Sequence, residues 1–268
     1  MAQQLYPDAN IQIMGYQESK TPDGFYDLVI GNVPFENTVI ADRRYNRVSP
    51  MLHDYFFLKG VDQLRAGGVM IAITSKGTMD KKDAKIRREL AKKAELVASI
   101  RLPTGAFEQY AGTKVVTDII ILRKRAEPIT DVSGEGWINA PEYQTPSKGD
   151  SPVYINQYYH DNPHMVIGTI DYGHGTTFNR PGMIVHRPTD MEQRLKDIVA
   201  RVPEMTYLKD KVKQAQVSYI ANHTKDREGA LTWQGDKLHV VMGEYLAPAE
   251  QVNKYALKDA AATAKRED

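Results

Sequence analysis

Three residues near the end of a predicted strand have the types needed to hold a planar base that carries an amino group. Asn32, Pro34 and Phe35 follow an apolar run within the stretch FYDLVIGNVPFENT. An exocyclic amine on an aromatic ring is a poor nucleophile because its lone pair is delocalised, so a site that alkylates it must hold both N–H bonds. The Asn32 side-chain oxygen and a backbone carbonyl supply two acceptors, and the Phe35 ring can stack on a base that has left its duplex. The pattern favours chemistry at a flipped-out adenine.

The order of these residues also has a simpler interpretation. Pro34 fixes its own φ angle and offers no competing N–H donor, which makes the turn rigid. Val33 or Pro34 then contributes the second carbonyl acceptor. A turn of the type Asn-x-Pro-aromatic can equally well serve only to end a strand, and the four residues alone do not decide between the two interpretations.

Two further pairs are candidate DNA contacts. Ser75 and Lys76 follow the apolar run 69–74, and Phe107 and Tyr110 lie in a glycine-flanked loop. The alternatives are a plain strand-to-helix turn for the first pair and aromatic anchors of a long loop for the second. The lysines and arginines of residues 81–93 alternate with acidic residues, which fits a solvated helix face better than a phosphate-binding surface.

Positioning these residues requires alternating strands and helices. Apolar runs predict strands, and apolar positions at helical spacing predict helices. We expect strands near residues 11–16, 26–30, 69–74, 96–102 and 117–123, and helices over 50–64 and 81–94. This rhythm predicts an α/β fold with a mostly parallel sheet, in which the last two strands form an antiparallel edge because no helix joins them. In such a sheet ligands bind at the carboxyl ends of the strands, where residues 32–35 and 75–76 are expected.

Composition divides the chain into three parts. Residues 1–126 form the α/β layer, and residues 127–189 are punctuated by proline and glycine, which predicts a linker or irregular excursion. Residues 190–268 carry helical patterns over 190–202 and 207–223 and weakly alternating strands over 230–242. The irregular linker and the C-terminal region are therefore expected to form an α+β part outside the sheet.

Composition also excludes several classes of site. The net charge is only +1, so the field of the whole protein does not identify a nucleic-acid partner. The absence of cysteine excludes disulfides and thiolate metal sites. His160, Asp161 and His164 lack an evident third ligand, so we expect no metal. No signal peptide or membrane-length apolar stretch is present, and we expect a cytoplasmic protein.

The order of the motifs resembles that of the N6-adenine DNA methyltransferases, a class I family whose catalytic motif is Asn or Asp, Pro, Pro and an aromatic residue. The matching residues here are Asn32, Val33, Pro34 and Phe35. Further motifs follow in the family's order: His53-Asp54-Tyr55-Phe56-Phe57, Gly67-Gly68-Val69, Thr74-Ser75-Lys76-Gly77 and Gly105-Ala106-Phe107. The resemblance is greatest to the methylase segment of helicase–methylase proteins of phages and mobile elements, and type I restriction-modification subunits share the Leu-Pro loop.

This resemblance implies a partial Rossmann-like sheet and transfer of a methyl group from S-adenosylmethionine to N6 of a flipped-out adenine in DNA. Asn32 and the carbonyl of Val33 or Pro34 would accept from the adenine amine, and Phe35 would stack on the ring. Valine at the second position departs from the usual proline, which makes the turn less rigid.

The same resemblance exposes a missing part. The family binds S-adenosylmethionine through a glycine-rich loop upstream of the catalytic turn, but only 31 residues precede Asn32 and no Gly-x-Gly occurs among them. We therefore expect an N-terminally truncated methyltransferase that needs a partner chain or a fused helicase–methylase context. A permuted donor loop at residues 173–177 is the other possibility. Two further alternatives are an inactive DNA-binding or assembly module of a restriction-modification or anti-restriction system, and a methyltransferase acting on protein or RNA.

Overall fold

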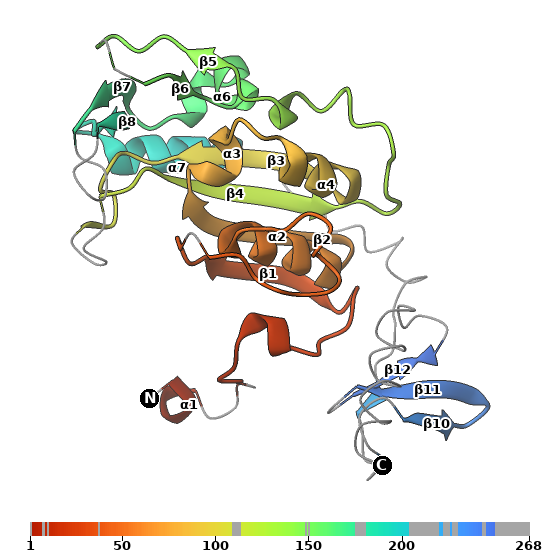
Figure 1. Cartoon of the computed structure of the whole chain (residues 1–268). Coiled ribbons are helices and arrows are strands. Elements are labelled where there is room, and N and C mark those ends of the chain that lie inside the picture. Colours follow the sequence, from red (N-terminus) through yellow and green to blue (C-terminus); the bar gives the residue numbers. More distant parts are fainter. Residues whose placement is uncertain are drawn as a thin grey trace. The chain divides into compact units, whose positions relative to one another are not determined.

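The computed structural model divides the chain into two compact units, which are drawn in Figure 1. One unit combines Met1–Pro22 with Val217–Asp268, and the other is Asp23–Gln216. The structure describes residues 2–6, 9, 11–36, 38–108, 114–147, 149, 151–174, 181–203, 220–221, 226, 230–242 and 245–249. The candidate site residues that are described all belong to the unit Asp23–Gln216.

The centre of this unit is a mixed four-stranded sheet. Its strands are β1 (Tyr26–Asn32), β2 (Leu64–Ser75), β3 (Ala94–Arg101) and β4 (Thr117–Lys124), in the order β1-β2-β4-β3. Only β1 and β2 run parallel, because β4 is antiparallel to both β2 and β3. The predicted antiparallel pairing of the last two strands is confirmed, but the expectation of a mostly parallel sheet is wrong for the described strands. After β3 the chain therefore reverses direction, and β4 inserts between β2 and β3.

Two helices cover this sheet. They are α2 (Leu52–Gln63) and α4 (Lys85–Lys93), which pack against each other and against the strands. Tyr55 and Phe57 of α2 are fully buried, as Leu90 of α4 nearly is. The short helix α3 (Gly77–Asp80) follows β2 directly. The predicted helices therefore form, although α4 begins four residues later than expected, after the Asp83 side chain accepts a hydrogen bond from the Lys85 N–H.

Strand β1 differs from its prediction in burial. Its continuous apolar run predicts a strand covered on both faces, but Leu28 is 50% exposed and Ile30 is 71% exposed. Among the described strands only β2 pairs with β1, so β1 lies at an edge of the sheet. An apolar, parallel edge strand with exposed side chains is unusual for a soluble domain, since such strands are normally covered.

The segment after β4 belongs to the same compact unit as the sheet. Its elements are η2 (Gly136–Ile138), β5 (Glu142–Tyr143), β6 (Val153–Tyr154), α6 (Gln157–Asp161), η3 (Pro163–Met165), β7 (Thr169–Gly173), β8 (Gly182–His186) and α7 (Met191–Arg201). Asn156 fastens this segment to α3: its buried side chain donates to the carbonyls of Met79 and Trp137 at 2.7 Å, and its N–H donates to Asp80 at 2.9 Å.

The other unit contains a small antiparallel sheet. The strands of this sheet are β9 (Ile220–Ala221), β10 (Leu231–Gln234), β11 (Lys237–Met242) and β12 (Tyr245–Pro248). The N-terminal segment of the unit contains the short helices α1 (Ala2–Leu5) and η1 (Tyr16–Glu18). The strands predicted within 230–242 are present, and Gly235 adopts a φ of 64° in their turn. The predicted strand at 11–16 is absent, while most of the helix predicted over 207–223 lies outside the described residues. None of the helices that the structure describes is long and apolar enough to cross a membrane.

Candidate functional site

The Asn-Val-Pro-Phe turn leaves the carboxyl end of β1. Asn32 is the last residue of the strand and lies opposite Ile73 of β2. The Val33 N–H donates to the Ile73 carbonyl at 2.9 Å, and the Val33 side chain is only 3% exposed. Asn32 and Pro34 are exposed, and Phe35 is half-buried. The valine therefore anchors the turn in the core and leaves the asparagine accessible at the strand end.

Polar contacts fasten the chain after this turn to α2. The Tyr45 hydroxyl donates to Asp62 Oδ2 at 2.9 Å, and the Tyr55 hydroxyl donates to Asp42 Oδ2 at 2.7 Å. Arg44 forms an ion pair with Asp62 at 2.9 Å. These contacts connect the residues downstream of the turn to a buried helix, so they limit the positions that the turn can adopt.

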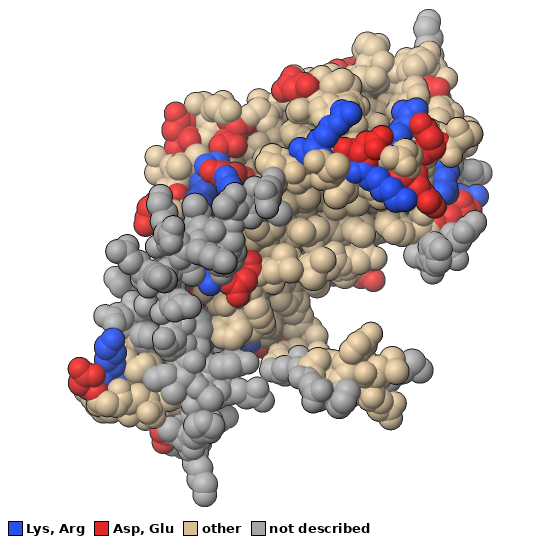
Figure 2. Space-filling model, turned by 180° about the vertical axis from the view of Figure 1, so that it is seen from behind, with Lys and Arg blue, Asp and Glu red and all other residues tan. Residues whose placement is uncertain are grey.

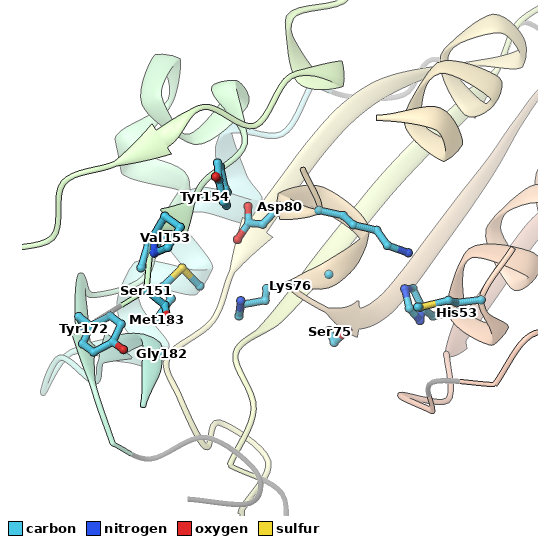
Figure 3. Close-up of a pocket in the computed structure, with 14 residues that line it drawn as sticks. His53, Ser75, Lys76, Asp80, Ser151, Val153, Tyr154, Tyr172, Gly182 and Met183 are labelled. Carbon is cyan, nitrogen blue, oxygen red and sulfur yellow. The ribbon is translucent and has the colours of Figure 1, made fainter. Parts of the chain in front are cut away.

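A cavity of about 380 Å³ opens beyond the carboxyl end of β2, and Figure 3 shows the side chains around it. One wall comes from the end of β2, the start of α3 and the start of α2. The opposite wall comes from β6, β7 and β8 and the residues beside them. The main polar and aromatic lining residues are His53, Ser75, Lys76, Lys81, Ser151, Tyr154 and Tyr172.

The floor of this cavity carries a histidine without a hydrogen-bond partner. His53 is 5% exposed, and its Nε2 atom makes no hydrogen bond among the described residues. Its Nε2 lies 3.4 Å from Asp54 Oδ1, which is ion-pair contact only if the ring is protonated. Burial lowers the pKa of His53 and outweighs the opposing effect of Asp54. Burial, the largest effect, therefore disfavours the charged form of the imidazole.

The acidic groups beside the cavity are paired with other cations. Asp80 lies 2.8 Å from Arg101, which also contacts Asp118 at 2.8 Å in a fully buried network. Burial raises the pKa of Asp80, and Arg101 opposes that effect. Asp54 lies 3.5 Å from the Lys81 ammonium. Each carboxylate therefore has a cation of the protein within ion-pair distance, although Asp54 Oδ2 and Asp80 Oδ2 make no hydrogen bond among the described residues.

Charge elsewhere does not form a broad basic surface on the face that Figure 2 shows. There the described lysine and arginine side chains alternate with aspartate and glutamate. Arg123 with Glu95 at 2.6 Å and Lys92 with Glu89 at 2.9 Å are examples of such pairing in the sheet and α4. This face therefore lacks the continuous positive charge that would bind a stretch of DNA backbone, and a phosphate contact requires a local site.

The structure brings together only some of the predicted site residues. Asn32, Val33, Pro34 and Phe35 form one turn, and Ser75 and Lys76 line the cavity at the end of the adjacent strand. Phe107 is half-buried in the turn after β3 and is not among the residues that line the cavity. Tyr110 lies outside the described residues.

Phe107 belongs to a loop that β8 holds in place. The Thr104 N–H donates to the Val185 carbonyl at 3.0 Å, and the Val185 N–H donates to Thr104 Oγ1 at 2.8 Å. This loop therefore depends on residues that lie about 80 positions later in the chain.

Sequence reasoning missed most of the cavity. His53 was named only as part of a family motif, and Tyr154, Tyr172 and Met183 lie in the segment expected to be irregular. No local signal identifies these residues, since their meeting with β2 depends on how the later segment packs. No cluster of metal-ligating side chains occurs within the part of the chain that is described.

Comparison with known proteins links the first half of the chain to one family. Residues 8–143 match the family described as N-6 DNA Methylase. The chain is also 35% identical over 128 residues to the defense against restriction protein B of Escherichia phage P1. That alignment covers 46% of this chain but 6% of the phage protein, so the chain spans only a small part of its relative.

Solved structures show more distant similarity. The modification subunit of a putative type I restriction enzyme from Vibrio vulnificus YJ016 aligns at 21% identity with a TM-score of 0.32, covering 39% of this chain and 24% of that one. A putative class I S-adenosylmethionine-dependent methyltransferase from Listeria monocytogenes aligns at 20% identity with a TM-score of 0.32, covering 46% and 37% of the two chains.

Proposed function

This chain belongs to the N-6 DNA methylase family, and from that premise we propose that it binds the target adenine of a DNA methylation reaction. The observation that carries the proposal is the exposed Asn32 side chain at the carboxyl end of β1, held there by the buried Val33. Binding an amine requires hydrogen-bond acceptors for its N–H groups and does not require a charged base. The neutral side-chain oxygen of an asparagine is such an acceptor.

The chemistry of the turn suits the N6 amine of adenine. The Asn32 oxygen accepts a hydrogen bond from one N–H, and the carbonyl of Val33 or Pro34 accepts from the other. Both bonds make the nitrogen lone pair less delocalised into the ring. Phe35 is half-buried and offers a ring face to the base. Stacking there replaces part of the stacking lost when the base leaves the duplex.

The described residues do not fit S-adenosylmethionine by themselves. Among the described strands β1 has no neighbour on its second side, so no described strand stands where a donor-binding loop would follow. We therefore assign no catalytic step to this chain that passes through the methyl donor. The proposed contribution of the chain is to bind and orient the adenine.

The exposed edge of β1 supports the addition of a further strand. Leu28 and Ile30 are exposed on a strand that already pairs in parallel on its other side. We propose that another segment, from a partner chain or a longer polypeptide, adds a strand at this edge and brings the donor site with it. The sheet would then be one half of a class I methyltransferase sheet, and a covered β1 would match its apolar sequence.

A direct test measures methyl transfer into DNA of mixed sequence. The chain is purified from cells together with the proteins that accompany it, and tritium-labelled S-adenosylmethionine and unmethylated genomic DNA are added. We expect label in N6-methyladenine with the accompanying proteins present and little label with the isolated chain. Label in protein or RNA instead of DNA would contradict the proposal.

A second candidate function is a DNA-binding or assembly module without enzymatic activity. The exposed apolar edge of β1, which suits assembly with another chain, favours it. It predicts salt-dependent DNA binding in every preparation and no methyl transfer in any of them. Calorimetric titration of the purified complex with S-adenosylmethionine separates the two, because only the methylase complex would take up the donor.

A further inference from the structure

We propose that the cavity beyond β2 binds one phosphate-linked nucleotide of the DNA strand that carries the target adenine, with the phosphate held by Lys76, Ser75 and His53. This inference rests on the proposed function and names what binds beside the adenine. The residues that line the cavity come from the described part of the unit Asp23–Gln216.

The first support is the charge that remains at the cavity. Asp80 is paired with Arg101 at 2.8 Å, and Asp54 lies 3.5 Å from Lys81. Among the described residues no carboxylate oxygen lies within ion-pair distance of the Lys76 ammonium, which lines the cavity. Lys76 acts electrostatically on the buried Asp80 carboxylate without forming an ion pair with it, so its ammonium can still bind an incoming phosphate.

The second support is a pair of convergent polar atoms on the floor. A Cβ atom built on Gly77 would lie 3.5 Å from Ser75 Oγ and 3.8 Å from His53 Nε2. Both atoms thus face the same small space above a residue without a side chain. His53 Nε2 is buried and lacks a hydrogen-bond partner, which costs free energy unless a ligand supplies one. A phosphate oxygen accepts from both a hydroxyl and a neutral imidazole.

The third support is the opposite wall. Tyr154, Tyr172 and Met183 line the wall opposite β2 (Figure 3), and the Lys82 ammonium lies 5.3 Å from the centroid of the Tyr154 ring. Aromatic faces bind sugars and bases of any sequence by stacking. The volume of about 380 Å³ is at the lower end of the range of small-molecule sites, which suits a single nucleotide better than a longer segment.

The position of the cavity relative to the turn fits one continuous strand of DNA. Asn32 lies opposite Ile73, and Ser75 is two residues further along β2. With strands ~4.8 Å apart and a rise of ~3.3 Å per residue, the Cα atoms of Asn32 and Ser75 are on the order of 8 Å apart. A nucleotide adjacent to the target adenine can therefore reach the cavity while the adenine lies at the turn.

The test uses the full chain and its seven histidines. Side-chain ¹H–¹⁵N spectra are recorded while a mixed-sequence single-stranded oligonucleotide is added, with His53→Gln used to assign the His53 signal. We expect the His53 signal to move on binding. An equal concentration of inorganic phosphate serves as the second probe and is expected to leave the signal in place, because it lacks the sugar and base that contact the tyrosine wall.

Two variants test the site by affinity, measured as fluorescence anisotropy across a salt series. Lys76→Ala should weaken DNA binding by about tenfold and reduce the salt slope by about 0.7. Its control is Lys92→Ala, which removes a lysine paired with Glu89 on α4. Gly77→Ala places a methyl group near Ser75 Oγ and His53 Nε2 without a steric clash, and because it occupies the proposed phosphate site it should also weaken binding. Its control is Gly134→Ala, whose methyl group would have no atom within 4 Å and should leave binding unchanged.

The outcomes are separate from those of the methylation assay, since neither readout requires a methyl donor. Weakened binding by both cavity variants with a moving His53 signal supports the site even if methyl transfer is never seen. Wild-type affinity in Lys76→Ala and Gly77→Ala, with circular dichroism confirming that they fold, would overturn it. So would no DNA binding by the wild-type chain, or a His53 signal that responds to free phosphate but not to DNA.

Discussion

Arg101 and Asp118 form a two-pronged ion pair at the centre of the unit that carries the site, with Nε to Oδ1 and Nη2 to Oδ2 both at 2.8 Å. Neither side chain is exposed. The Arg101 guanidinium also contacts Asp80 at 2.8 Å, and it lies 4.1 Å from the centroid of the Tyr159 ring. This group therefore joins β3, β4, α3 and α6, so it connects the sheet to the segment that closes the cavity.

Removing one partner of this pair should destabilise the fold strongly. We expect Asp118→Asn to lower the free energy of unfolding by about 3–5 kcal/mol, because it removes a negative charge that compensates the buried Arg101 guanidinium. Urea denaturation followed by circular dichroism measures the change. Glu108→Gln is the control, since Glu108 and its partner Lys114 are 50% and 57% exposed, and about 1 kcal/mol or less is expected there. Similar losses in both variants would contradict the importance of the buried pair.

A second prediction concerns the attachment of the later segment to α3. Asn156→Ala leaves the carbonyls of Met79 and Trp137 without their donor, and its Oδ1 no longer caps α6 through the Tyr158 N–H. We expect a loss of about 2–3 kcal/mol and faster hydrogen exchange in residues 151–165 than in β2. Asn162→Ala removes a single bond to the Tyr158 carbonyl and serves as the control. Uniform exchange in the two variants would show that Asn156 does not hold the segment.

The sequence is informative about local structure and much less so about the cavity. Periodicity alone predicts α2, half of β2 and most of β4, because their apolar spacing reflects burial. It fails for the exposure of β1, because an apolar run indicates that the strand favours burial but does not indicate whether neighbouring elements cover it. It also fails for Tyr172 and Met183, whose place beside Lys76 depends on contacts such as that of Asn156 with Met79, made 77 residues apart.

The turn itself is the part of the site that sequence reasoning describes best. Asn32, Pro34 and Phe35 lie at a strand end as predicted, because a strand followed by a proline turn is a local feature. The anchoring of that turn was not predicted, since Val33 was considered as a source of a carbonyl and as a substitution that makes the turn less rigid. Its buried side chain shows why an apolar residue suits the position where the family usually has proline.

The acid stability of the fold should depend on Asp62. Burial alone would raise the pKa of Asp62, but Arg44, Lys93 and Lys124 together lower it below its ordinary value. A carboxyl whose pKa falls on folding stabilises the folded state above the unfolded-state pKa of about 3.9, and this contribution is lost as the pH falls through the folded-state pKa.

Asp62→Asn should therefore cost about 3 kcal/mol near neutral pH, and the difference from wild type should shrink below about pH 4. Urea denaturation at a series of pH values measures it. The exposed Asp83→Asn is the control and should follow wild type at every pH. A difference between Asp62→Asn and wild type that grows on acidification would have the wrong sign for this account.

The proposed partner edge can be tested by a charge on β1. Ile30 is 71% exposed, so Ile30→Lys should change the stability of the isolated chain by no more than about 0.5 kcal/mol. A lysine there opposes the addition of another strand, and we expect fewer co-purifying proteins and less methyl transfer. Val199→Lys, at a 56% exposed position on α7, is the matched control. Unchanged co-purification in Ile30→Lys would rule out this edge as the contact.

The most direct test of the central claim compares two asparagines. Asn32→Ala removes the side-chain acceptor proposed to hold the adenine amine, and Asn46→Ala removes an exposed asparagine in the following loop. Transfer of tritium-labelled methyl groups to adenine is measured with each variant in the purified complex. Losing one such stabilising group typically costs about 10²–10³ in rate, so we predict at least that loss for Asn32→Ala and wild-type transfer for Asn46→Ala. Wild-type transfer by a folded Asn32→Ala complex would contradict the assignment of this turn as the adenine site.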